Sequence, residues 1–175
     1  MTEDLTPDPK DTAERIIAIF VDDRLKALPL PEGFWEDDYV LGFLMCGAVM
    51  LTEARHGDEL EQLAAADATF EALGEMSGKG AEAMKDRVGE LQNSGSLVYL
   101  DAMKMADKLV RFISGVTMAA LDPVVLKARE QALGMFADGS LDPEVVPEDA
   151  AVRGVLVNHL FTDVVKERFK IEADA

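Results

Sequence analysis

Residues 39–56 read Tyr-Val-Leu-Gly-Phe-Leu-Met-Cys-Gly-Ala-Val-Met-Leu-Thr-Glu-Ala-Arg-His, and this stretch decides the fold. Its first thirteen residues, 39–51, contain no charged side chain. A helix that is apolar on every side is buried, so we expect this one at the centre of the protein. It is too short for a membrane span, which needs about 20 apolar residues. The small residues Gly42, Cys46 and Gly47 predict a surface where a second helix packs closely.

Helical periodicity continues through the rest of the chain, where apolar residues recur every three or four positions and nowhere alternate as in a strand. We therefore predict an all-α fold, a compact bundle or orthogonal array of about seven helices around the central helix 39–56. Residues 1–9 are expected to form a disordered acidic tail, and residues 10–175 a single all-α domain. The other helices are expected at 11–28, 58–76, 80–93, 96–116, 122–136 and 148–170.

Short polar residues mark the expected helix starts, because their side chains accept hydrogen bonds from the first free backbone N–H groups. Asp122 followed by Pro123 is the strongest of these signals, since proline favours the first helical position. Gly57 is expected to end the central helix. The other predicted N-terminal caps are Asp11 with Thr12, Asp58 and Ser96.

The charge of the chain is strongly negative, with 34 acidic against 17 basic side chains, a formal net charge of −17 and a pI near 4.4. Direct binding to nucleic acid or to an anionic membrane needs the opposite excess, so neither is expected. The stretches 1–9, 32–38, 58–75 and 138–149 together carry −18, and all other residues sum to +1. If these stretches share one face, they attract a basic protein or a cation, whereas on separate faces they serve solubility.

Targeting and redox signals are sparse. The first ten residues, MTEDLTPDPK, lack the basic start and apolar stretch of a secretory signal. Cys46 is the single cysteine, so no intramolecular disulfide is possible, and we expect a small core residue in a reducing cytoplasm. The glycines at 78, 80 and 89 do not form a phosphate-binding loop, and no cofactor is expected.

A possible metal site lies at the end of the central helix. Glu53 and His56 stand three residues apart, the spacing with which helical di-iron proteins direct a carboxylate and an imidazole at one metal. The alternative is that His56 meets the free carbonyls at the helix end before Gly57. The only other histidine, His159, is expected to be partly buried and hydrogen-bonded, with Asp163 four residues on as one acceptor.

Two further features suit protein binding. Phe34 and Trp35 lie in an expected loop, where aromatic residues either fill the core or contact a partner. Methionines, Met84, Met103 and Met105 among them, either line an adaptable groove for a partner helix or fill the core. The candidate interaction residues are Phe34, Trp35, Asp37, Asp38, Glu61, Asp67, Glu71 and Asp142.

Together these patterns predict a non-enzymatic protein–protein interaction module, a homodimer with a protein partner of basic character. The alternative is a metal-dependent, di-iron-like helical enzyme that uses Glu53 and His56. A third reading is an acidic surface that mimics nucleic acid and occupies a basic protein.

Two segments resemble the YgfB/YecA-like proteins. Residues 39–47, with Gly-Phe-Leu and Cys-Gly, are similar to the signature of an early helix in that family, and residues 110–116 are similar to its Phe-x-x-Gly helix. An acidic stretch, 138–149, and an apolar helix, 150–165, follow in the same order. No tryptophan precedes Phe112, and the cysteine-rich metal module of longer members is missing. The resemblance implies an acidic, all-α domain without an established catalytic site.

Overall fold

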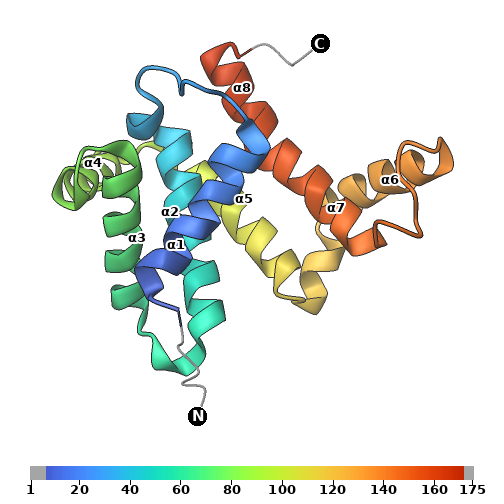
Figure 1. Cartoon of the computed structure of the whole chain (residues 1–175), viewed down its shortest axis with the longest axis horizontal. Coiled ribbons are helices and arrows are strands. Elements are labelled where there is room, and N and C mark those ends of the chain that lie inside the picture. The colour runs from blue at the N-terminus through green and yellow to red at the C-terminus, as the bar shows by residue number, and fades with distance from the viewer. Residues whose placement is uncertain (1–6, 172–175) are drawn as a thin grey trace.

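The structure is a computed structural model that describes residues 7–171. Every regular element in that range is helical, and Figure 1 shows their arrangement, so the all-α prediction is confirmed. Two of the helices contain a π-helical turn and continue through it, so the described range holds seven continuous helices, joined by loops and short 3₁₀ turns. The helices are α1 (Pro9–Ala18, continued by the π-helical turn Ile19–Leu25), α2 (Asp38–His56), α3 (Gln62–Ser77), α4 (Ala81–Ser94), α5 (Leu97–Ile113), α6 (Pro123–Ala137), α7 (Glu148–Val157) and α8 (Asp163–Phe169, joined to α7 by the π-helical turn Asn158–Thr162).

The helix α2 forms the centre of the protein, as its sequence predicts. The ring of Phe43 in α2 lies with its centre 5.4 Å from that of Phe20 and 4.9 Å from that of Phe161. Helices from the N-terminal and the C-terminal parts of the chain therefore both pack against α2. The helix α5 crosses α2 at Gly42, where a Cβ atom would come within 2.5 Å of the Tyr99 carbonyl oxygen. The expected close approach of a second helix is confirmed at this glycine.

The first helix begins earlier than predicted. Its N-cap is Asp8, whose side chain accepts from the Lys10 N–H, and Pro9 occupies the first turn. This is the same Asp-Pro signal that correctly predicts α6, where Asp122 accepts from the Val124 N–H. Asp11 and Thr12 lie inside the helix, so the cap predicted there is wrong. Residues 1–6 of the predicted tail lie outside the described residues.

The helix α3 differs from its prediction in start and in buried face. Residues Gly57–Glu59 form a 3₁₀ turn, so Asp58 caps nothing and α3 begins at Gln62. In the sequence, Leu63, Phe70 and Leu73 recur on one side of the expected helix and predict one buried stripe. The structure divides it, because Leu73 is buried but Leu63 is 73% exposed. The buried face consists of small side chains, which let α3 lie close to α1 and α2: Ala65, Ala68, Thr69, Ala72 and Gly74.

The C-terminal third extends to one side of the molecule. The helix α6 packs on α7, and the 3₁₀ turn Thr117–Leu121 connects it to α5 (Figure 1). Val116 was expected on the core face of the fifth helix but lies beyond its end at Ile113, with 43% of its surface exposed. No helix among residues 7–171 is long and apolar enough to cross a membrane.

Candidate functional site

A groove lined mainly by apolar side chains is the most distinctive surface feature of the protein. It has a volume of about 610 Å³ and lies among α2, α3, α4 and α5. We call it the methionine groove, because three methionines line it. Its residues are Met45, Cys46, Val49, Met50, Gln62, Leu63, Ala66, Phe70, Lys85, Val88, Gly89, Gln92, Tyr99 and Met103.

The groove stays hollow because two of its walls carry small residues. Gly89 lies within α4, and a Cβ atom added there would meet no atom within 4 Å. Ala66 supplies only a methyl group from α3, between Leu63 and Phe70. Larger residues at these two positions would fill the space, so the cavity follows from side-chain size along two separate helices.

The sulfur groups of the groove are suited to contact and not to nucleophilic chemistry. The Cys46 Sγ lies 3.6 Å from the Met50 Sδ. Burial, reinforced by the negative charge of Asp107, raises the pKa of the Cys46 thiol to about 11. Because only the thiolate is a strong nucleophile, this cysteine is almost wholly unreactive at neutral pH.

The one cation in the groove is already held by acidic groups. The Lys85 ammonium lies 3.2 Å from Asp67 and 3.5 Å from Glu82, and 5.9 Å from the centre of the Phe70 ring. The hydrogen bond to Asp67 raises the pKa of Lys85 above its ordinary value. An acidic ligand would therefore have to displace Asp67 before it could use this charge.

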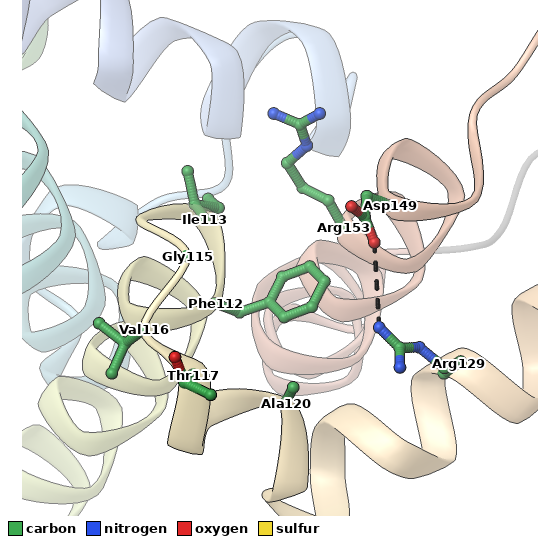
Figure 2. A pocket seen from close by; sticks show the side chains of 9 residues that line it. All are labelled: Phe112, Ile113, Gly115, Val116, Thr117, Ala120, Arg129, Asp149 and Arg153. Atoms are coloured by element: carbon green, nitrogen blue, oxygen red, sulfur yellow. Dashed lines mark ion pairs between the residues drawn. The ribbon is translucent and has the colours of Figure 1, made fainter.

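A second cavity lies where α5 ends, against α6 and α7 (Figure 2). It has a volume of about 460 Å³, and the Phe112 ring occupies its middle in Figure 2. Arg129 lies 3.9 Å from Asp149 and 3.4 Å from Glu148, so its charge is balanced from within the chain. The Arg153 guanidinium points away from this pair. The lining therefore brings together no acid, base and nucleophile that would form a catalytic set.

The predicted metal pair, Glu53 and His56, lies in the last turn of α2. The His56 Nε2 lies 3.1 Å from the Thr12 Oγ1 of α1, which fixes the ring against that helix. The Gly57 N–H donates to the Glu53 carbonyl, so Gly57 ends α2 as predicted. Within residues 7–171, no three His, Cys, Asp or Glu side chains cluster in a way that could hold a metal ion. The contact that the structure gives the His56 ring is with the Thr12 hydroxyl of α1, and not with a free carbonyl at the end of α2 as the alternative expected.

His159 lies in the π-helical turn, apart from both cavities. Its Nε2 is 2.7 Å from the Gln131 Oε1, and its Nδ1 is 3.7 Å from Asp163. The predicted partly buried and hydrogen-bonded histidine is confirmed, but its hydrogen-bond partner is Gln131 of α6, which the sequence did not indicate. Asp163, the acceptor that the sequence predicted, lies beyond hydrogen-bond distance.

The aromatic pair of the loop belongs to the core. Phe34 is 1% exposed and packs edge-on against Trp35, with the two ring centres 5.0 Å apart. The Phe169 ring of α8 lies 5.9 Å away on the other side. Phe34 is therefore a core residue and not a contact residue, and Trp35 is half-buried against it.

Asp37 and Asp38 hold the start of α2. Asp37 caps the helix and also accepts two hydrogen bonds from the Arg168 guanidinium, at 2.7 and 3.1 Å. Asp38 accepts from Ser96 at 2.6 Å and pairs with Arg87 at 3.0 Å. Both carboxylates are engaged in contacts within the fold, and their role in partner contact stays a prediction.

The remaining predicted contact residues are exposed acidic residues: Glu61, Asp67, Glu71 and Asp142. The first three lie in or next to α3, and Asp142 lies in the loop after α6, at the opposite end of the longest axis (Figure 1). The acidic stretches 58–75 and 138–149 therefore do not form one face. The negative net charge of the chain therefore does not by itself support a single acidic docking face.

The methionine groove was only partly foreseen. Of the three methionines singled out, Met103 lines it, but Met84 is 1% exposed in the core and Met105 lies elsewhere on α5. Met45 and Met50 were not singled out, because within the apolar run of α2 they are indistinguishable from core residues. The absence of a large residue opposite them, at Gly89, depends on how α4 packs.

Comparisons with known proteins identify no relative. No family model matches the chain, and no curated protein or solved structure is significantly similar to it.

Proposed function

We propose that this chain is a non-enzymatic protein-interaction module that holds a segment of a partner protein in the methionine groove. The observation that carries the proposal is the groove itself, an apolar hollow of about 610 Å³ with Leu63 73% exposed at its edge. Contiguous exposed apolar surface marks sites of interaction, and methionine side chains adapt to the shape of a partner.

The chemistry around the groove supports binding more than catalysis. The Cys46 thiol is uncharged at neutral pH, because burial raises its pKa to about 11. The imidazoles of His56 and His159 are hydrogen-bonded elsewhere and do not line the groove. No base therefore stands beside a nucleophile in it, whereas nucleophilic catalysis needs such a pair.

Site-specific photo-cross-linking tests this function. A photo-reactive side chain at position 63 is expected to capture a protein from native lysate, and the same group at Leu28, which is 85% exposed outside the groove, is not. The blocking variant Gly89→Leu is expected to abolish capture. Gly134→Leu is the matched control, because Gly134 also lies inside a helix with no atom within 4 Å of an added Cβ. Capture that survives Gly89→Leu would refute the proposal.

We also propose a homodimer through the surface around the 3₁₀ turn Thr117–Leu121. Val116, Met118 and Leu121 are 43%, 71% and 62% exposed and line one hollow of about 420 Å³. Apolar patches of this kind suit an isologous contact, in which both copies use the same surface. Size-exclusion chromatography with light scattering is expected to give a dimer for the wild type and a monomer for Met118→Glu. A monomeric wild type at high concentration would refute the dimer.

A cytoplasmic location and kinship with the YgfB/YecA-like proteins belong to the same proposal. Both agree with an acidic helical module that has a single, unreactive cysteine. Neither is needed for the cross-linking test.

A further inference from the structure

The shape of the methionine groove favours a helical occupant. On α3 its lining residues Leu63, Ala66 and Phe70 recur at three- and four-residue spacing, and on α4 Lys85, Gly89 and Gln92 do the same. Each of these stripes runs from its first residue to the residue seven positions on, a rise of about 10 Å at 1.5 Å per residue. An apolar stripe on a partner helix at positions i, i+3 or i+4, and i+7 has the same length.

The floor and the rim of the groove are both apolar but differ in exposure. The floor is formed by Met45, Cys46, Val49 and Met50 of α2, with Met103 beside them. Flexible thioether side chains accept apolar groups of differing shape. The exposed Leu63 lies at the rim, where it can close over an inserted side chain.

The charge around the groove selects a basic partner. Residues 58–94, which supply the α3 and α4 walls, carry nine acidic and three basic side chains. Of the three cations, Lys79 and Arg87 pair with Glu36 and Asp38, and Lys85 pairs with Asp67 and Glu82. Exposed carboxylates of the same segments lie outside the lining of the groove: Glu59 and Glu61 before α3, Glu71 on α3 and Asp86 on α4. The surroundings of the groove are therefore predominantly negative, and the three cations of residues 58–94 are already paired.

We infer that the methionine groove takes a basic amphipathic helix, whose leucine-sized side chains enter the groove while lysine or arginine side chains meet the carboxylates of α3 and α4. This inference rests on the proposed function and specifies its partner. Apolar contact supplies the affinity, and complementary charge supplies orientation and rate of association.

Two synthetic peptides test the inference on the full-length protein. Both have roughly 18 residues, five helical turns, with the same leucine stripe, and one carries lysine and the other glutamate at all remaining positions. Fluorescence anisotropy is expected to give a dissociation constant about tenfold or more lower for the leucine–lysine peptide. Gly89→Leu is expected to weaken that binding about tenfold, and Gly134→Leu to leave it unchanged.

A charge-adding variant separates groove binding from general attraction to an acidic protein. Leu63→Asp places a polar group at the groove while making the protein more negative, and Leu28→Asp adds the same charge elsewhere. If the peptide binds in the groove, Leu63→Asp should weaken the binding of the leucine–lysine peptide and Leu28→Asp should not. If neither Gly89→Leu nor Leu63→Asp weakens this binding, the peptide binds to surface charge alone and the inference is overturned.

The outcome for the partner's chemistry is distinguishable from the outcome for the function. If position 63 captures a protein in a manner that Gly89→Leu abolishes, but the glutamate peptide binds as well as the lysine peptide, the interaction function stands and the basic helix is refuted. If an apolar small molecule and no protein is captured, both fail.

Discussion

The contact between α2 and α5 allows the sharpest test of the packing, through two glycines on the same helix. At Gly42 a Cβ atom would lie 2.5 Å from the Tyr99 carbonyl oxygen and 2.9 Å from the Ala102 Cβ. At Gly47 the nearest atom would be the Ala106 Cβ at 3.8 Å, an ordinary contact. The same change, Gly→Ala, therefore clashes with a backbone atom at Gly42 and makes only an ordinary van der Waals contact at Gly47.

The magnitudes follow from these distances. Ordinary contact begins at 3.4 Å, so Gly42→Ala requires α5 to move by about 0.9 Å, against backbone that cannot rotate away. Overpacking of this kind costs about 1–3 kcal/mol, and the better helix propensity of alanine returns about 1 kcal/mol. Gly47→Ala gains the propensity without the clash. We expect Gly42→Ala to lose up to about 2 kcal/mol and Gly47→Ala to gain up to about 1 kcal/mol. Because the propensity gain is common to both variants, their free energies of unfolding should differ by the clash alone, about 1–3 kcal/mol.

Urea unfolding followed by circular dichroism measures both free energies of unfolding. In thermal unfolding, each kcal/mol corresponds to roughly 2–4 °C for a chain of this size, so a difference of about 1–3 kcal/mol should separate the two variants by about 2–12 °C in Tm. The packing argument is wrong if Gly42→Ala proves as stable as Gly47→Ala, whether both variants gain or both lose stability.

Three further predictions concern single groups. Burial raises the pKa of Cys46 from 9.0 to about 11, so at pH 8 its thiolate fraction in the folded protein is about a hundredfold lower than in the unfolded chain. Iodoacetamide labelling of the folded protein, followed by mass spectrometry, should therefore be slower by a similar factor than labelling in urea. Equal rates would contradict a buried thiol. Burial opposes ionisation of Asp122, but the Val124 N–H and the Lys108 ammonium outweigh it and hold the pKa below the ordinary 3.8. The stability that Asp122 contributes is therefore fully present above pH 3.8 and is lost as the pH falls through the lower pKa of the folded state. Asp122→Asn should make the free energy of unfolding depend less steeply on pH in the acid range. An unchanged pH dependence would refute the role of Asp122. Arg168→Gln should lower that free energy by about 1 kcal/mol at neutral pH and Asp37→Ala by about 2 kcal/mol, because only the second also removes a helix cap; equal losses in urea unfolding would show that the cap contributes nothing.

The helix positions could be predicted because the signals that set them are local. Asp122 with Pro123, Ser96 and Gly57 act on backbone groups a few residues away, and each predicted helix end agrees with the structure there. Asp58 failed for a related reason: the chain turns through the 3₁₀ residues Gly57–Glu59 before α3 can begin. A cap residue predicts a helix start only where the preceding turn permits one.

The candidate site was harder to predict, because a groove is a space that the side chains of several helices leave unfilled, and this depends on how those helices pack. Gly89 of α4 looks like an ordinary helical glycine in sequence, and it shapes a cavity only because α2 and α3 lie opposite. Leu63 reads as part of a buried stripe, yet the small face of α3 packs inward and leaves it exposed. The groove at Gly89 and the exposure of Leu63 thus both depend on the sizes of side chains and on how the helices that carry them pack.

The sequence by itself determined that this protein is helical, where its helices lie and that α2 is central, because periodicity, caps and an all-round apolar helix are encoded within short segments. Only the tertiary structure decided that Phe34 is core, that Asp37 and Asp38 hold α2 in place and that the acidic stretches lie on separate parts of the surface. These facts depend on contacts between residues far apart in the chain, such as Asp37 with Arg168. Local patterns contain no information about which distant side chain will complete them.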